Sequence, residues 1–209
     1  MRGAILKLNN IFYSFEGEGR WQGYPTIFIR LAGCNIACAW CDTDHSMRCN
    51  KTPQEIMDKI RDYPASIVKI TGGEPLLQSK ELEELVILLK DLKYLVSLET
   101  NGTIFNEAIF GMVDLICMDI KTPGSREKSL SDVITQTDAE FPDKTEFKMV
   151  ISNGKDLDFI SNNFLVDSRI VITPVTGPGF PDKALLERIL YEFPDCRLGV
   201  RLHVIMQVD

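Results

Sequence analysis

Short β-branched runs alternate with helical stretches along most of this chain, and this alternation is the feature that most limits the fold. The run Ser66–Ile70 is followed by a stretch from Ser79 to about Lys93, in which Leu and Val recur at helical spacing. Further strands are predicted at Tyr94–Leu98, Asp114–Met118, Glu146–Ile151 and Arg169–Ile172, and further helices from Lys155 to about Phe164 and from Lys183 to Tyr191. The alternation predicts an α/β fold with a parallel sheet.

Two more strands are predicted near the ends of the series. Thr26–Leu31 is β-branched and aromatic, and Arg197–Val204 is predicted as the last strand and carries His203. Between the first strands, Thr52-Pro53-Gln54-Glu55 predicts a helix start, because Thr can cap the helix and Glu three residues later closes a capping box. This helix is predicted to run to about Arg61.

Polar residues and glycines gather directly after the predicted strands. Thr71-Gly72-Gly73-Glu74-Pro75 follows one strand, and Glu99-Thr100-Asn101-Gly102 follows the next. The carboxyl ends of parallel strands meet at one edge of a sheet or barrel, where α/β proteins keep their active sites. Since about six strands are too few for an eight-fold barrel, we expect a reduced, partly open TIM-like barrel.

Length and charge narrow the possible functions. The 209 residues, 44% of them hydrophobic, suit a single domain over residues 1–209. A net charge of -7 gives no broad basic surface for a nucleic-acid backbone. No apolar run is long enough to span a bilayer and no signal-peptide core is present, so we expect a cytoplasmic protein with reduced cysteines and no membrane partner.

Three cysteines, Cys34, Cys38 and Cys41, lie close together after a glycine. Three thiolates on a 4Fe-4S cluster leave one iron without a protein ligand, so that iron can take part in chemistry. A zinc site usually needs four ligands, and His45 is the nearest candidate for a fourth. The spacing alone leaves an iron–sulfur site, a zinc site and unligated thiols open.

Charge and glycine near this motif suggest a ligand. Arg30 is a charged residue on an apolar strand that ends beside the cysteines, and the planar fork of Arg binds a carboxylate or phosphate well. An ion pair from Arg30 to Glu16 or Glu18 is the competing explanation. Glu16-Gly17-Glu18-Gly19 predicts a turn where backbone approaches another group closely, although a plain surface turn explains the same pattern.

The cysteine motif together with Gly72-Gly73-Glu74-Pro75 after a strand resembles the radical S-adenosylmethionine (SAM) superfamily. The combination is far more specific than either half. Within that superfamily the chain resembles the 7-carboxy-7-deazaguanine synthase family, through segments that span nearly its whole length. These segments are Phe15-Glu16-Gly17-Glu18-Gly19, Phe28 to Cys34, Ala39-Trp40-Cys41-Asp42-Thr43, Thr71 to Pro75, Glu99 to Gly102, and His203.

The resemblance implies a 4Fe-4S cluster on Cys34, Cys38 and Cys41 and a SAM molecule on its open iron. Further residues match the SAM contacts of the family: Trp40, Asp42, Gly73, Glu74, Asp119, Ile120, Lys121, Thr173, Pro174, Val175 and Thr176. The implied substrate is 6-carboxy-5,6,7,8-tetrahydropterin, which undergoes ring contraction with loss of ammonia. The chemistry would belong to the cofactor, and the protein would position the substrate and exclude competing reactions.

The resemblance also implies substrate and magnesium contacts. Substrate-binding residues are implied at Phe15, Glu16, Gly17, Arg30, Thr71, His203 and the terminal Asp209, with Arg30 on the substrate carboxylate. Thr43 matches a contact to Mg²⁺, an ion that keeps several waters and few protein ligands. The family usually has Gln where this chain has Glu16, and a carboxylate there would repel an anionic substrate unless it were protonated or paired.

The remaining expectations concern the partners of the protein and two alternative functions. The family implies a homodimer and a reductant such as flavodoxin or ferredoxin. A glycyl-radical-enzyme activase shares the cysteine spacing and a small barrel but acts on a protein glycine. A non-catalytic zinc-binding module is the alternative from another class. His203 is also compatible with an ordinary core histidine, and Cys49, Cys117 and Cys196 are expected to be thiols without a ligand role.

Overall fold

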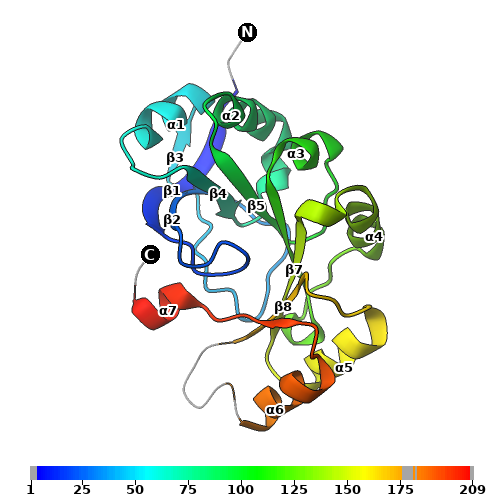
Figure 1. Cartoon of the computed structure of the whole chain (residues 1–209). Coiled ribbons are helices and arrows are strands. Elements are labelled where there is room, and N and C mark those ends of the chain that lie inside the picture. The colour runs from blue at the N-terminus through cyan, green and yellow to red at the C-terminus, as the bar shows by residue number, and fades with distance from the viewer. Residues whose placement is uncertain (1–3, 176–180, 182, 208–209) are drawn as a thin grey trace.

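A single mixed sheet organises the molecule, and helices cover its outer side (Figure 1). The structure is a computed structural model that describes residues 4–175, 181 and 183–207. Within these residues the sheet has nine strands in the order β3-β1-β2-β4-β5-β6-β7-β8-β9. It curls without closing, which confirms the partly open barrel.

One edge of the sheet is antiparallel. β1 (Leu6–Phe15) pairs antiparallel with β2 (Pro25–Leu31), and the short β3 (Cys49–Lys51) pairs antiparallel with the first half of β1. The loop between β1 and β2 therefore lies at the amino end of β2, opposite the end that carries Arg30. This loop, residues 16–24, turns toward the barrel interior, because Glu16 is buried and bonded to Lys69 of β4.

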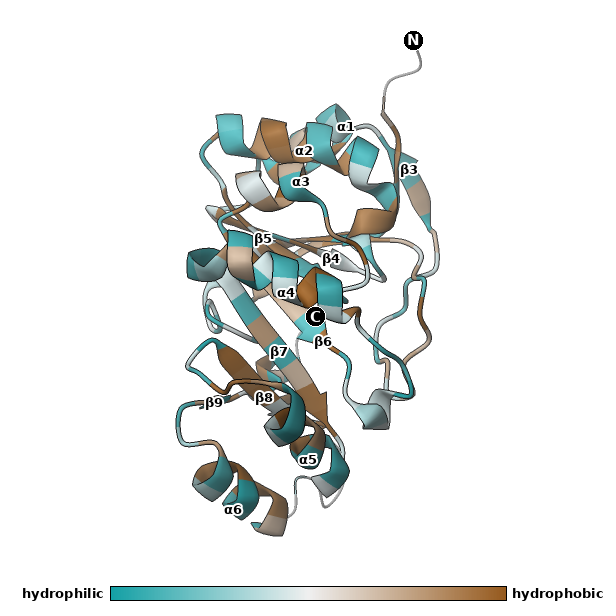
Figure 2. Cartoon of the chain, turned by 90° about the vertical axis from the view of Figure 1, so that its right-hand side faces the viewer, coloured by the Kyte–Doolittle hydropathy of each residue, from teal (hydrophilic) through white to brown (hydrophobic). Residues whose placement is uncertain are grey.

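In the sheet order, every strand from β4 to β9 pairs parallel with the strand before it. These strands are β4 (Ile67–Gly72), β5 (Leu95–Thr100), β6 (Leu115–Ile120), β7 (Thr145–Ile151), β8 (Ile170–Pro174) and β9 (Arg197–Leu198). The register sets Arg30 beside Thr71 and Leu31 beside Gly72, so the polar strand ends predicted from the sequence meet at one edge. In Figure 2, β8 is mostly hydrophobic in colour, as expected for a strand buried on both faces.

The helices are α1 (Pro53–Ile60), α2 (Ser79–Asp91), α3 (Glu107–Met112), α4 (Ser131–Glu140), α5 (Gly154–Asn163), α6 (Lys183–Glu192) and α7 (Leu202–Met206). The predicted capping box of α1 is confirmed, since Thr52 and Glu55 bond reciprocally. α2 buries Leu82, Leu85, Val86 and Leu89 against the sheet. In the part of the chain described, no helix has the length and apolar character needed to cross a membrane.

The sequence-based prediction was wrong in one strand and incomplete in four elements. The last strand covers Arg197–Leu198 alone, and His203 lies on α7 instead. Apolar residues of the short run Leu202–Met206 fit strand and helix spacing equally well, so periodicity could not decide. β1, β3, α3 and α4 were not predicted, because β3 and α3 are short and the apolar residues of β1 and α4 show no clear period.

Candidate active site

A cavity of about 550 Å³ occupies the barrel interior and its carboxyl-end mouth. Strands β1, β2, β4, β5, β6 and β7, the loop 32–48 and helix α7 all contribute to its wall. Most residues predicted to bind a ligand line it together. They are Phe15, Glu16, Gly17, Arg30, Cys34, Cys38, Trp40, Cys41, Asp42, Thr43, Thr71, Gly73, Asp119, Lys121 and His203.

Some predicted residues do not line the cavity. Glu74, Ile120, Thr173 and Pro174 are buried behind its wall, and Val175 is half-buried beyond the end of β8. Thr176 and Asp209 lie outside the described residues. The SAM contacts predicted at 173–176 and the terminal substrate contact therefore remain predictions.

The three cysteines lie on the loop 32–48 between β2 and β3, which we call the cluster loop. Their thiols are free and all three line the cavity. The described residues contain no group of three or more His, Cys, Asp or Glu side chains that could hold a single metal ion. A 4Fe-4S cluster binds each thiolate through a different iron, so thiols that share one wall without converging on a point fit a cluster better than one zinc ion.

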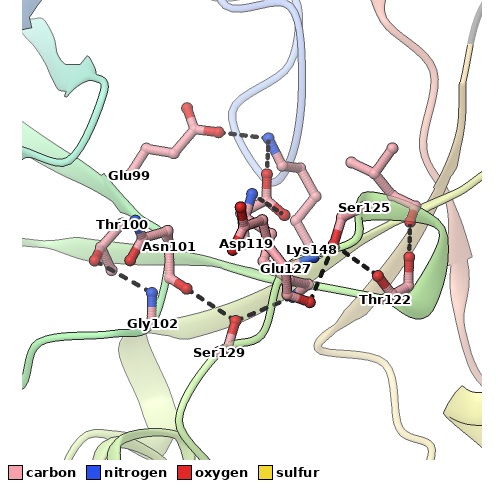
Figure 3. Close-up of polar contacts among 12 residues, drawn as sticks. Glu99, Thr100, Asn101, Gly102, Asp119, Thr122, Ser125, Glu127, Ser129 and Lys148 are labelled. Carbon is pink, nitrogen blue, oxygen red and sulfur yellow. Dashed lines mark hydrogen bonds and ion pairs between the residues drawn. The ribbon is translucent and has the colours of Figure 1, made fainter. Parts of the chain in front are cut away.

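The segment 122–129 accepts hydrogen bonds from the main chain of the cluster loop. Ala39 N–H donates to the Ser125 carbonyl and Ala37 N–H donates to Glu127 Oε1, each at 2.9 Å. Ser125 and Glu127 are themselves held by hydrogen bonds within the segment 122–129 (Figure 3). Two main-chain groups of the cluster loop are thus held by a neighbouring loop.

The Gly72-Gly73-Glu74 turn lies against the cluster loop. A Cβ on Gly73 would lie 2.0 Å from the Gly33 carbonyl oxygen and 2.8 Å from Cys34 Cβ, so only glycine fits at this distance. The buried Glu74 carboxylate accepts bonds from Leu76 N–H, Thr100 Oγ1 and Asn101 N–H. Its side chain therefore joins the turn to the end of β5.

Charged side chains inside the barrel are paired with one another. Lys69 Nζ lies 3.0 Å from Glu16 Oε1 and 3.2 Å from Glu99 Oε2. Lys148 contacts Glu18 at 2.7 Å, and it also pairs with Glu99 and Asp119 (Figure 3). Each lysine is therefore surrounded by carboxylates within the cavity wall.

Burial and pairing oppose each other in this network. Burial works against the charge of Lys69 and Lys148, but the surrounding carboxylates outweigh it and hold the pKa of both lysines well above the usual value. Burial likewise acts to raise the pKa of Glu99, yet Lys148 and Lys69 hold that pKa well below 4.5. Burial raises the pKa of Glu16, with Lys69 opposing. The lysines remain cationic and Glu99 remains anionic.

Arg30 is the exception among the cations of this wall. Its buried Nε has no hydrogen-bond partner, and its guanidinium lies 5.0 Å from the centre of the Phe12 ring. No ion pair joins Arg30 to Glu16 or Glu18 within the described residues, because those carboxylates bind Lys69, Lys148 and Arg201. The guanidinium is therefore available to a ligand. An internal ion pair to Glu16 or Glu18 does not explain the charge of Arg30 on an apolar strand.

Sequence reasoning missed three cavity residues that pair these carboxylates: Lys69, Lys148 and Arg201. Lys69 and Lys148 each lie within an apolar buried strand, the same signal that marked Arg30. Arg201 lies between Val200 and Leu202 in the segment predicted as the last strand, so the same signal was present there.

Comparison with known proteins agrees with this geometry. The family model of the radical SAM superfamily matches residues 28–191. The chain belongs to the radical SAM superfamily. Membership brings the 4Fe-4S cluster and SAM as cofactors, a small-molecule substrate and the need for a reductant. The zinc-binding module expected as an alternative is therefore set aside.

Relatives narrow the assignment within the superfamily. The chain is 35% identical to a 7-carboxy-7-deazaguanine synthase of Methanospirillum hungatei, over 95% of this chain and 84% of that protein. It is 34% identical to the synthase of Chlorobaculum tepidum, over 96% of this chain and 93% of that one. The chain thus belongs to the 7-carboxy-7-deazaguanine synthase family of radical SAM lyases.

Solved structures support the fold. The crystal structure of QueE from Escherichia coli matches with a TM-score of 0.73 and 24% identity, over 95% of each chain. Streptococcus suis SuiB bound to S-adenosylmethionine matches with a TM-score of 0.57 and 16% identity, over 80% of this chain and 48% of that one. At these identities the structures show a shared radical SAM fold.

Proposed function

We propose that this protein converts 6-carboxy-5,6,7,8-tetrahydropterin to 7-carboxy-7-deazaguanine with loss of ammonia. The names of its relatives supply the reaction, and the free guanidinium of Arg30 is the observation that carries it to this chain. A substrate carboxylate can occupy the donors of Arg30 without displacing an internal partner. When bound, the cofactors would supply the radical chemistry of the reaction, and Cys34, Cys38 and Cys41 would hold the cluster.

The chain's own residues would position the substrate and limit the electrostatic repulsion between the substrate and the cavity wall. Phe15, Gly17, Thr71 and His203 line the same cavity as Arg30 and are the proposed substrate contacts. Glu16 remains a proposed contact as well, with its carboxylate already engaged by Lys69. Since the carboxylates of this wall are paired with lysines, the repulsion expected at Glu16 is offset within the protein.

The SAM side of the site would be formed by Gly73, Trp40, Asp42, Asp119 and Lys121 along the mouth of the cavity. Lys121 Nζ lies 3.0 Å from Asp119 Oδ1, so this pair presents donors and acceptors together. Glu74 and Ile120, which lie behind the wall, would act by holding the turn and the end of β6 in place.

We also propose that Thr43 contributes a ligand to Mg²⁺. Its Oγ1 lies 3.4 Å from Asp42 Oδ1 on the cavity wall, so hydroxyl and carboxylate oxygens are adjacent there. The Thr43→Ala variant is then expected to lose activity and the response of activity to magnesium. Activity and magnesium dependence equal to those of the parent would remove this assignment.

The function is tested with anaerobically reconstituted protein, SAM, a reductant and carboxytetrahydropterin. We expect 7-carboxy-7-deazaguanine by mass spectrometry. Release of 5'-deoxyadenosine without a deazaguanine product would contradict the proposed substrate, and a glycyl-radical-enzyme activase would then be the next activity to assay. Sedimentation in the same buffer would test the expected homodimer, which like the flavodoxin or ferredoxin reductant is carried over from the family.

A further inference from the structure

The segment 199–207 joins the β8–β9 edge of the sheet to the β1–β2 loop. Gly199 N–H donates to the Ile172 carbonyl on β8, and Leu202 N–H donates to the Gly17 carbonyl in the β1–β2 loop. Gln22 Nε2 donates to the carbonyls of Gly17 and Val200, each at 2.7 Å. Figure 1 shows α7 beside the loop that joins β1 and β2. Among the residues that the structure describes, no strand pair closes the gap that this segment bridges.

Arg201 lies at the centre of that bridge, at the N-cap of α7, and its side chain is only 8% exposed. Its Nη1 lies 2.6 Å from Asp42 Oδ2 of the cluster loop, and its Nε lies 3.7 Å from Glu18 Oε1. The guanidinium therefore contacts two segments far apart in sequence from α7 and from each other. Arg201 and both carboxylates line the cavity.

The contact to Asp42 continues into the barrel network. Glu18 also binds Lys148, which binds Glu99, and Glu99 binds Lys69. Opposite charges alternate from the cluster loop to the floor of the cavity, and Arg201 joins the two parts. Other than Arg201, Asp42 has one contact of its side chain within the described residues, the 3.4 Å bond from Thr43. Nearly all the restraint on the Asp42 carboxylate thus comes from the C-terminal segment.

We propose that Arg201 is a positioning residue that fixes the cluster loop to the β1–β2 loop through Asp42 and Glu18, and so sets the SAM side of the cavity. Asp42 directly follows the ligand Cys41, so a change in its position moves the mouth of the cavity where SAM binds. A planar guanidinium suits this role because it can bind two carboxylates from one fixed position, which a lysine ammonium on a flexible stem does less well.

The test is a double-mutant cycle on Arg201 and Asp42, with the SAM dissociation constant of the reconstituted protein as the first readout. We expect Arg201→Met and Asp42→Asn each to weaken SAM binding five- to tenfold. The double variant should bind SAM about as well as the weaker of the two single variants. Arg201→Lys should fall between the parent and Arg201→Met. Losses that multiply in the double variant, or no loss in the single ones, would overturn the proposal.

A second readout needs no cofactor. Hydrogen exchange of the cluster-free protein should be faster in Arg201→Met than in the parent over residues 39–44 and also over 199–207. Faster exchange confined to 199–207 would show a purely local role and would contradict the proposal. Arg201→Met leaves no buried charge unpaired, because Glu18 keeps its bond to Lys148 and Asp42 is half exposed. In Asp42→Asn the buried Arg201 guanidinium keeps Glu18 as a partner at 3.7 Å.

Arg188 offers a matched control. It also makes several contacts, to Asp158, Glu192 and the Gly154 carbonyl, but it lies on α6 away from the cavity wall. Arg188→Met should leave the SAM dissociation constant and exchange over 39–44 unchanged. Neither readout uses the pterin substrate, so failure of the proposed function and failure of this inference would be seen separately.

Discussion

Lys69 Nζ lies 3.0 Å from Glu16 Oε1 in the floor of the cavity, with both side chains about 5% exposed or less. The pair resolves the conflict that a carboxylate at position 16 posed for an anionic substrate. Lys69 stays cationic because Glu16 and Glu99 outweigh the effect of burial on its pKa. The floor therefore presents a paired carboxylate to the ligand.

Replacement of Lys69 by Met should destabilise the fold by about 3–5 kcal/mol, because Glu16 is left buried without its cation. Urea unfolding of the cluster-free protein measures the loss. The double variant Lys69→Met with Glu16→Gln should recover part of it, since an amide costs less to bury than an unpaired carboxylate. A single variant as stable as the parent would mean that the pair contributes nothing to folding.

The stability of the protein in acid should depend on Glu99. Burial opposes its ionisation, but Lys148 and Lys69 hold its pKa well below the 4.5 of an ordinary Glu. A carboxyl whose folded pKa is depressed stabilises fully above the unfolded pKa, and that stabilisation is lost as pH falls toward the folded pKa. The stability advantage of the parent over Glu99→Gln should thus be constant above about pH 4.5 and shrink below it. Urea unfolding of both proteins down to about pH 3 measures the difference, and an advantage that grows in acid would contradict the assignment.

Gly73→Ala should impair loading of the cluster. A Cβ at this position would meet the Gly33 carbonyl at 2.0 Å, and the cluster loop would have to shift to make room. Iron and sulfide content after reconstitution measures the effect, which we expect as a severalfold loss. Gly111→Ala on α3 is the control, because nothing lies within 4 Å of its added Cβ and Ala favours a helix by up to about 1 kcal/mol.

Arg30→Met should weaken substrate binding with little effect on folding. Charged hydrogen bonds contribute about 1.5–3 kcal/mol, so KM should rise about tenfold or more. The stability loss should not exceed about 1 kcal/mol, the range of a cation–π contact such as that with Phe12. Arg30→Lys keeps the charge without the planar fork and should give an intermediate KM. A large stability loss with unchanged KM would show that Arg30 is structural.

The sequence was sufficient to predict the parallel part of the fold. Buried parallel strands are nearly continuous apolar runs, so Ser66–Ile70 and Glu146–Ile151 stand out, and the leucine spacing of α2 marks its buried face. Short elements such as β3 and α7 form because neighbouring segments supply their hydrogen bonds. Local sequence does not contain that information, which is why the strand predicted at Arg197–Val204 includes the first turn of α7.

Some residues of the candidate site were predictable from the sequence, and others were not. Cys34, Cys38, Cys41 and Gly73 follow from motifs, because cluster ligation and close backbone approach restrict residue type at fixed spacing. The pairing of Glu16 with Lys69, and of Asp42 with Arg201, joins residues 53 and 159 positions apart. Such pairs depend on the curvature of the sheet, so their partners became visible only in three dimensions.

The incomplete closure of the sheet determines which bonds limit the width of the barrel. A fully closed barrel widens only by breaking ladder hydrogen bonds between strands. In this protein the circumference is completed by segment 199–207, through a few main-chain bonds and the side chains of Gln22 and Arg201. Separating that segment from the β1–β2 loop would break these few contacts and leave every β-ladder of the described residues intact.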